Sequence, residues 1–330
     1  MLKVSRILVV FTGGTIGSSV SDGWISPDGD TKHLIIEKYR NITGDKETIF
    51  IPIIPYTTLS EYLSEREINL LSDCLFENID KGYDGIIVTH GTDTIQYTAA
   101  ALSYMLSGAD IPIVLVSAAY PLEDERSNGV SNFTGAVEFI KKKVGKGVFV
   151  SYKNEGCEKT DIHIGTRLMA HQEGDADLYS LDKVPYAYLD ENGITINKEI
   201  KASKGAGKIE LSHCPEILMI ESKVGERYDY NLDNIKAIIL VPYHSATLNT
   251  KDENFVNLCL KAREKGIPVF LVNKRKGVTY ESAKLYDDLR IELLPFSSKI
   301  SIYVKCWIGL SKDEDIREFV KMPLAQEFCE

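Results

Sequence analysis

Short apolar runs alternate with amphipathic segments along the first half of the chain. The apolar runs are rich in β-branched residues and too short for buried helices, and their side chains do not alternate between apolar and polar. Such runs are typical of parallel strands that are covered by helices on both faces. The predicted strands are residues 7–11, 85–89, 111–116 and 147–151. The clearest helical patterns between them cover about 94–106 and about 132–143.

The character of the sequence changes between about residues 190 and 212. This stretch is polar, rich in glycine and poor in large apolar residues, which is the composition of an interdomain connection. Strand and helix patterns resume after it. We therefore predict an α/β protein with a larger N-terminal domain that contains a doubly wound parallel sheet, and a smaller C-terminal α/β domain. The predicted boundaries are 1–190 for the first domain, 191–212 for the linker and 213–330 for the second domain.

Composition and charge indicate which kinds of molecule the protein is expected to bind. Of the 330 residues, 44% are hydrophobic and 26% are charged, as in an ordinary globular protein. Acidic residues outnumber basic ones by 48 to 38, which gives a formal net charge of −10. Because a field of that sign repels polyanions, we expect no binding to nucleic acid or to anionic membranes. A small-molecule partner is the expectation that remains.

We expect a chain that neither spans a membrane nor carries a secretion signal. No run approaches the ~20 apolar residues that span a bilayer. The first apolar run is too short for the core of a signal peptide, so we expect a cytoplasmic protein. The six cysteines are scattered singly, which argues against metal clusters and redox pairs. An even number leaves disulfides open, but cysteines in apolar runs favour buried thiols.

Two loops that follow predicted strands carry unusual chemistry. Ligands of open parallel sheets bind beyond the carboxyl ends of the strands. The loop T-G-G-T-I-G offers the hydroxyls of Thr12 and Thr15 beside two glycines, and it matches neither a dinucleotide fingerprint nor a phosphate loop. The loop T-H-G-T-D-T at 89–94 holds three hydroxyls and a carboxylate. Asp93 or Thr94 is expected to cap the following helix, but capping does not account for the other groups.

Together, these loops resemble the two signatures of the bacterial-type L-asparaginase and glutaminase family. Its members are amidohydrolases with a threonine nucleophile, and the likeness is greatest to the cytoplasmic type. The signatures read F-T-G-G-T-I at 11–16 and I-V-T-H-G-T-D-T at 87–94. The segments V-L-V-S-A-A-Y-P at 114–121 and S-N-G-V-S-N at 127–132 continue the likeness. The resemblance covers the N-terminal domain well and the C-terminal domain weakly.

The resemblance implies roles for individual residues. By position, Thr15 is the acyl-accepting nucleophile, while Thr92 and Asp93 position the attacking water and hold the amino group of the substrate. The segment T-L-S-E-Y-L resembles the substrate loop of the family, which implies that Ser60 and Glu61 bind the carboxylate and amino groups of the substrate. A solvated helix start explains much of this last match.

Further implied features concern the oxyanion, the assembly and cofactors. The backbone amides of the 13–15 turn and of the segment around Ala118, residues 117–119, are natural oxyanion donors. Asn249 stands in a segment that resembles one whose asparagine reaches the site of a neighbouring subunit. The resemblance therefore implies a homodimer or homotetramer, and it implies neither a metal nor an organic cofactor.

Two positions depart from the family pattern. Trp24 stands where family members have a tyrosine beside the nucleophile, and an indole cannot accept a proton. The lysine expected after Arg167 falls on Ala170, and a shift of one residue gives His171. A threonine needs a base, and the loss of one such group costs ~10²–10⁴-fold in rate. His171 is a candidate, although a histidine without a role is equally consistent with the sequence. Three tyrosines are further candidates that the sequence does not separate: Tyr39, Tyr56 and Tyr62.

Three functions are consistent with these residues. The leading hypothesis is hydrolysis of the side-chain amide of L-asparagine, or of glutamine, to the acid and ammonia. The alternative is an asparaginase-fold protein that binds amino acids without turnover, which Trp24 and Ala170 favour. The third is an amidotransferase subunit that deamidates glutamine for transfer to an acylated RNA. We rank it last, because such a subunit needs a partner and usually extra N-terminal sequence, and because the chain is acidic.

Overall fold

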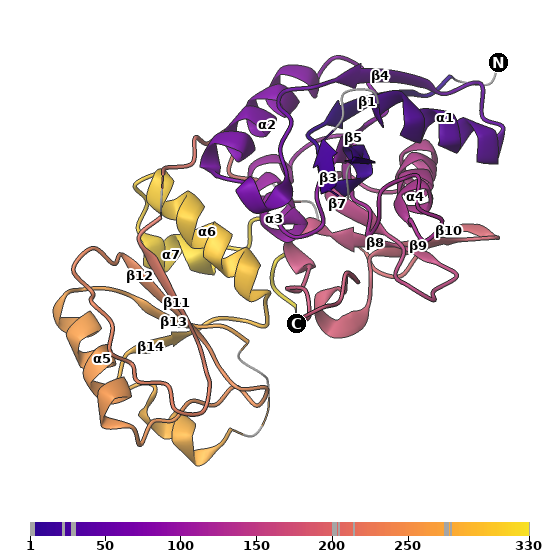
Figure 1. Cartoon of the computed structure of the whole chain (residues 1–330). Helices are drawn as coiled ribbons and strands as arrows, with labels where there is room; N and C mark the ends of the chain where they lie inside the picture. The colour runs from indigo at the N-terminus through magenta and orange to yellow at the C-terminus, as the bar shows by residue number, and fades with distance from the viewer. Residues whose placement is uncertain are drawn as a thin grey trace. The chain divides into compact units, whose positions relative to one another are not determined.

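A computed structural model gives the fold of the chain (Figure 1). It describes residues 4–21, 24–27, 31–199, 203, 205–213, 215–273, 277 and 279–329, with side chains except at 18–32. The chain divides into two compact units. The first comprises Met1–Glu210 with Leu324–Gln326, and the second comprises Leu211–Pro323 with Glu327–Glu330. Among the described residues, we find no helix with the length and apolarity to cross a bilayer.

The first unit contains a mixed sheet of eight strands. Its spatial order is β10-β9-β8-β7-β6-β5-β1-β4. The five strands from β7 to β4 in this order are parallel, and β8, β9 and β10 continue the sheet antiparallel. The strands are β1 (Arg6–Phe11), β4 (Ile49–Ile53), β5 (Gly85–Thr89), β6 (Pro112–Val116), β7 (Gly147–Tyr152), β8 (Thr160–Ile164), β9 (Ala187–Asp190) and β10 (Gly193–Ile196). The four predicted strands correspond to β1, β5, β6 and β7, while the sequence pattern missed β4 and the antiparallel edge.

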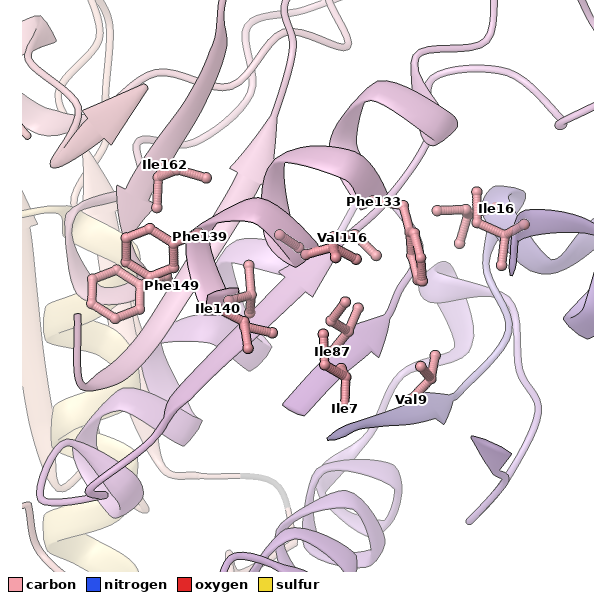
Figure 2. Close-up of a cluster of buried hydrophobic side chains, with 14 of the residues drawn as sticks. Ile7, Val9, Ile16, Ile87, Val116, Phe133, Phe139, Ile140, Phe149 and Ile162 are labelled. Carbon is pink, nitrogen blue, oxygen red and sulfur yellow. The ribbon is translucent and has the colours of Figure 1, made fainter. Parts of the chain in front are cut away.

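Helices cover both faces of this sheet. Helices α1 (Thr31–Thr43) and α4 (Gly129–Lys142) bury one face, where Phe133, Phe139 and Ile140 of α4 pack on strand residues of the same cluster (Figure 2). On the opposite face, α3 (Ile95–Leu106) packs against β7, and α2 (Glu65–Asn78) packs against α3. Leu8 and Val88 are fully buried, as the unbroken apolar pattern of their strands predicts.

Part of the predicted linker belongs to the first unit. Strand β10 lies within the polar stretch and pairs with β9 at the edge of the sheet, where its last two residues are exposed. Further along, the amide of Ala206 donates to the carbonyl of Tyr104 at the end of α3. An edge strand has a polar composition because little of it is buried, so composition alone made it look like a connection.

The second unit is a smaller α/β sandwich. Strands β11 (Ile217–Glu221), β12 (Ala237–Val241), β13 (Val269–Leu271) and β14 (Ile291–Leu293) form a parallel sheet. Helix α5 (Glu253–Glu264) buries one face, and its N-cap Asp252 accepts two amides of the first turn. Helices α6 (Lys299–Ser311) and α7 (Ile316–Lys321) bury the other face. Of the described cysteines, none is in a disulfide; Cys259, Cys306 and Cys329 are buried, and Cys157 is exposed.

A buried histidine in β8 is expected to make the first unit sensitive to acid. Burial lowers the pKa of His163 to about 4, whereas a histidine in an unfolded chain titrates near 6.5. Between these values the unfolded chain binds more protons, so the free energy of unfolding falls as the pH is lowered. At pH 5 this residue costs about 2 kcal/mol relative to pH 7. We expect urea unfolding of His163→Gln to show a smaller loss between pH 7 and pH 5, whereas His33→Gln, at an exposed position, behaves like the parent. An unchanged pH dependence in His163→Gln would contradict this prediction.

Candidate active site

The carboxyl ends of β1 and β5 bring the two unusual loops together in the first unit. Beyond β1 the chain turns through two glycines, with φ of +102° at Gly13 and +74° at Gly14. The amide of Gly14 donates to the carbonyl of Thr58 at 3.1 Å, and the amide of Thr58 donates to the carbonyl of Thr12 at 3.0 Å. A Cβ atom on Gly14 would lie 2.3 Å from the backbone nitrogen of Gly91. Three segments far apart in sequence therefore meet with their backbones in contact.

The two threonines of the first loop have different environments. The hydroxyl of Thr12 is buried and donates to the carbonyl of Thr89 at 2.6 Å, which ties β1 to β5. Thr15 begins a short 3₁₀ helix, Thr15–Gly17, and its side chain is half-buried. From the loop alone, the hydroxyls of Thr12 and Thr15 are equally good candidates for the nucleophile. In the structure, the Thr12 hydroxyl is used in a hydrogen bond between β1 and β5, so Thr15 is the better candidate nucleophile.

The second loop presents a carboxylate supported by a buried serine. Asp93 is exposed, and its Oδ2 accepts a hydrogen bond from the Ser60 hydroxyl at 3.3 Å. Thr94 occupies the N-cap of α3 without capping it, because its hydroxyl donates to the carbonyl of Ser60 at 3.0 Å. The expectation that Asp93 or Thr94 caps this helix through its side chain is therefore wrong for Thr94, and Asp93 precedes the cap. The hydroxyls of this loop hold neighbouring segments instead.

Hydrogen bonds connect four of the predicted site residues. Thr92 is buried, and its hydroxyl donates to the carbonyl of Ala118 at 3.0 Å. Ser60 contacts Asp93 as described, and a Cβ atom on Gly91 would collide with Ser60. Glu61, which follows Ser60, is exposed at the surface of the unit. The first unit thus gathers Ser60, Thr92, Asp93 and Ala118, whereas Asn249 is an exposed residue of the second unit.

Two of the amides expected to bind an oxyanion have other partners. The amide of Ala119 donates to Oδ1 of Asn128, at the start of α4, at 2.9 Å. The amide of Gly14 donates to Thr58. The prediction of oxyanion donors is therefore wrong at these two positions, because each amide anchors the loop that carries it. The carbonyl of Ala118 faces Thr92, so this residue contributes an acceptor to the site.

The surroundings of the three candidate tyrosines differ, and they show which hydroxyl could act in the site. The hydroxyl of Tyr39 donates to Asp45 at 2.8 Å, and the side chain of Tyr62 is 70% exposed. The hydroxyl of Tyr56 is buried and lacks a hydrogen-bond partner in the described part of the chain, although it lies beside Thr12. Burial raises the pKa of Tyr56 well above its usual range. This hydroxyl therefore stays protonated and can serve as a donor, not as a base.

Buried polar atoms without partners also occur along this edge of the sheet. Within the described residues they include Oε1 of Gln96, in the first turn of α3, and the hydroxyl of Ser117, which follows β6. Buried polar groups in folded proteins are nearly always paired, so such atoms indicate room for a ligand or ordered water. From the sequence, Ser117 is a candidate only through its backbone amide, and Gln96, which follows the second loop, is not singled out.

The histidine of the second loop has a structural role. Burial lowers the pKa of His90 to about 4, so the ring is neutral near pH 7. Its Nδ1 lies 2.8 Å from the carbonyl of Gly91, and its Nε2 lies 2.8 Å from the hydroxyl of Thr98. A neutral ring with the proton on Nδ1 donates to the first and accepts from the second. His90 thereby holds the turn that carries Thr92 against α3.

The positions that depart from the family pattern lie in different parts of the first unit. Nε2 of His171 is 2.9 Å from the carbonyl of Thr92, so this ring contacts the backbone of the threonine–aspartate pair. Ala170 precedes it and is half-buried. Arg167 donates from Nε to the carbonyl of Gln326 at 2.6 Å. Trp24 begins β3 (Trp24–Pro27), which pairs with β2 (Ser18–Ser21), and its side chain lies outside the described residues.

The described side chains do not form a metal site. No group of three or more histidine, cysteine, aspartate and glutamate side chains in this part of the chain is arranged to hold an ion. The site is instead built from hydroxyls, one exposed carboxylate and backbone groups. Such a set of groups is suited to acyl transfer through a hydroxyl nucleophile.

Comparison with known proteins identifies the family. Residues 6–202 match the family model described as Asparaginase, N-terminal. This range contains the glycine turn with Thr15, the segment with Ser60 and the loop with Thr92. The chain belongs to the asparaginase family. Among its curated relatives, a glutamyl-tRNA(Gln) amidotransferase subunit of Methanococcus maripaludis is 29% identical over 231 residues, which are 67% of this chain and 53% of that protein. The L-asparaginase of Thermococcus kodakarensis is 27% identical over 223 residues, which are 67% of this chain and 64% of that protein.

Solved structures show that the family fold extends through both units. The thermostable L-asparaginase of T. kodakarensis superimposes with a TM-score of 0.80 at 22% identity, covering 98% of this chain and 99% of that one. L-asparaginase I of Vibrio cholerae gives 0.81 at 21% identity, with coverage of 99% and 100%. These values confirm the predicted fold class. The chain spans about half the length of the amidotransferase subunits that it matches.

Proposed function

We propose that the chain is an amidohydrolase that cleaves the side-chain amide of a small amino acid, with L-asparagine as the first candidate. The observation that carries this proposal is the convergence of the Thr15 loop and the Thr92–Asp93 loop at one edge of the sheet. In the proposed reaction, the Thr15 hydroxyl attacks the amide carbon. The tetrahedral intermediate collapses, the amide nitrogen takes up a proton and leaves as ammonia, and water then cleaves the acyl-threonine ester.

The neighbouring groups support the binding and hydrolytic steps of this reaction. The exposed Asp93 carboxylate, held by Ser60, is suited to bind the ammonium group of an amino acid. The Thr92 hydroxyl donates its proton to the Ala118 carbonyl, so its lone pairs are available to accept a hydrogen bond from the attacking water. We assign Glu61 to the rim of the candidate site, because the residue follows Ser60 and is exposed.

The assembly and location belong to the same proposal. We assign Asn249 of the second unit to the site of a neighbouring subunit, which requires a homodimer or homotetramer. The net charge of −10 supports a small-molecule substrate over a polyanion, and we propose a cytoplasmic location. Light scattering that gives the mass of a monomer at the concentration of full activity would exclude the shared site.

A second candidate function is the amidotransferase reaction. The curated relatives that favour it are named as subunits of glutamyl-tRNA(Gln) amidotransferases. In this case glutamine is the substrate, and ammonia passes to an acylated RNA on a partner protein. We rank hydrolysis first, because an acidic net charge disfavours binding to a polyanionic RNA.

Ammonia release tests the proposal directly. We expect purified protein to release ammonia from L-asparagine, and to release it more slowly from L-glutamine. Rapid release from glutamine alone would favour the amidotransferase function. If asparagine or aspartate raises the melting temperature of the protein but no ammonia appears from either amide, the chain binds amino acids without turnover, and the proposal is wrong.

A further inference from the structure

The ring of His171 lies between two backbone carbonyl oxygens. Its Nε2 is 2.9 Å from the oxygen of Thr92, and its Nδ1 is 3.3 Å from the oxygen of Asp177. The ring is half-buried. It therefore bridges the loop at 171–177 and the loop that carries Thr92 and Asp93. The sequence offered His171 as one of several groups that could act as the base for Thr15.

These contacts are not those of a general base. A base needs a nitrogen lone pair directed at the proton that it removes. Here both ring nitrogens face carbonyl oxygens, which can only accept hydrogen bonds. In a neutral imidazole, one nitrogen would direct its lone pair at a carbonyl lone pair, which is repulsive. Only the imidazolium, with an N–H group on each nitrogen, satisfies both carbonyls at once.

We propose that His171 acts as its imidazolium, a positioning residue that holds a positive charge behind the Thr92–Asp93 pair. This inference rests on the proposed function. The cation fixes the Thr92 carbonyl, and with it the hydroxyl that Thr92 directs at Ala118. A positive charge at this point also reduces the cost of the negative charge that develops in the tetrahedral intermediate.

The two loops that the ring bridges carry several charged groups. Asp93 follows the residue whose carbonyl accepts from Nε2, and the loop that supplies the other carbonyl is acidic. The carboxylate of Asp177 accepts from the amide of Glu155 and from the hydroxyl of Tyr179. Two cations, Arg126 and Lys153, line the same hollow of about 480 Å³ as Asp175 and Asp177. The carboxylates on these two loops are those of Asp93, Glu173, Asp175 and Asp177.

The two roles predict opposite pH profiles. A general base acts when it is deprotonated, so kcat would rise as the pH is raised through its titration. An imidazolium that positions Thr92 acts when it is protonated, so kcat falls as the pH is raised.

The test uses substitutions that separate charge from shape. We expect His171→Lys, which keeps a cation, to retain kcat within about tenfold and to move the alkaline fall to higher pH. His171→Gln keeps a donor but no charge, and we expect it to lower kcat by about 10²-fold with a smaller change in KM. The matched control is His33→Gln on the exposed side of α1, which leaves kcat and its pH profile unchanged.

A measurement without turnover separates this inference from the proposed function. Long-range ¹H–¹⁵N correlations of the imidazole rings, assigned with His171→Gln, report the protonation of each nitrogen. Two protonated nitrogens at the pH of greatest activity support the imidazolium, and a single protonated nitrogen overturns it. A kcat that rises through the titration, or an unchanged kcat in His171→Gln, also overturns it. If no ammonia is released but both nitrogens are protonated, the proposed function fails while the charge assignment stands.

Discussion

Replacing Thr15 with alanine is expected to lower ammonia release from asparagine by roughly 10⁴–10⁶-fold, the range seen when a hydroxyl nucleophile is removed. Thr15 is half-buried at the start of a short helix, and its methyl and hydroxyl groups leave with little change in packing. Thr12, the other threonine of this loop, already donates to Thr89. The variant should therefore lose the chemical step and keep its fold, which a coupled ammonia assay and thermal unfolding measure together.

Two control variants test whether the loss of activity comes from the Thr15 hydroxyl. Thr15→Ser keeps the hydroxyl, and we expect it to retain measurable turnover. Thr12→Val removes the bond to the Thr89 carbonyl, so we expect it to lower the free energy of unfolding by about 1 kcal/mol. Mass spectrometry after acid quenching should detect the acyl adduct in the parent protein and not in Thr15→Ala. Turnover that survives in Thr15→Ala would show that another residue is the nucleophile.

Replacing Gly14 with alanine is expected to lower the free energy of unfolding by about 2–5 kcal/mol and to abolish activity. Gly14 has φ of +74°, which costs an L-residue about 1–2 kcal/mol. Its added Cβ would lie 2.3 Å from the nitrogen of Gly91 and 2.5 Å from the carbonyl carbon of His90. Backbone atoms cannot escape by changing rotamer, so the two loops must separate, and overpacking of this kind costs about 1–3 kcal/mol more. Urea unfolding and the ammonia assay measure the two effects.

Gly156 provides the matched control. It has φ of +69°, and an added Cβ there meets no atom within 4 Å. Gly156→Ala therefore carries the conformational strain alone, and we expect a loss of about 1–2 kcal/mol with activity retained. Equal losses in the two variants would mean that the close approach of the loops contributes nothing to stability.

The location of the candidate site could be predicted because parallel strands end at one edge of a sheet. The loops after β1, β5 and β6 were identified from the apolar runs that precede them, and Thr92 and Ala118 from these loops share a hydrogen bond. Pairwise contacts within each loop were harder to predict. Thr94 was expected to cap α3 and instead donates to Ser60, because a segment 34 residues earlier in the chain competes for its hydroxyl. Composition likewise misjudged β10, since an exposed edge strand resembles a linker.

The sequence by itself determined the fold class, the family and the loops that carry hydroxyl and carboxylate groups, because buried strands and glycine turns impose local patterns on the chain. Only the tertiary structure decided which of these groups meet. The Thr12 hydroxyl is hydrogen-bonded to Thr89, which leaves Thr15 as the candidate nucleophile. Both ring nitrogens of His171 face carbonyl oxygens. Those choices depend on contacts between segments that are remote in sequence. A local sequence pattern cannot predict these hydrogen bonds, because the donor and the acceptor come together only after the chain has folded.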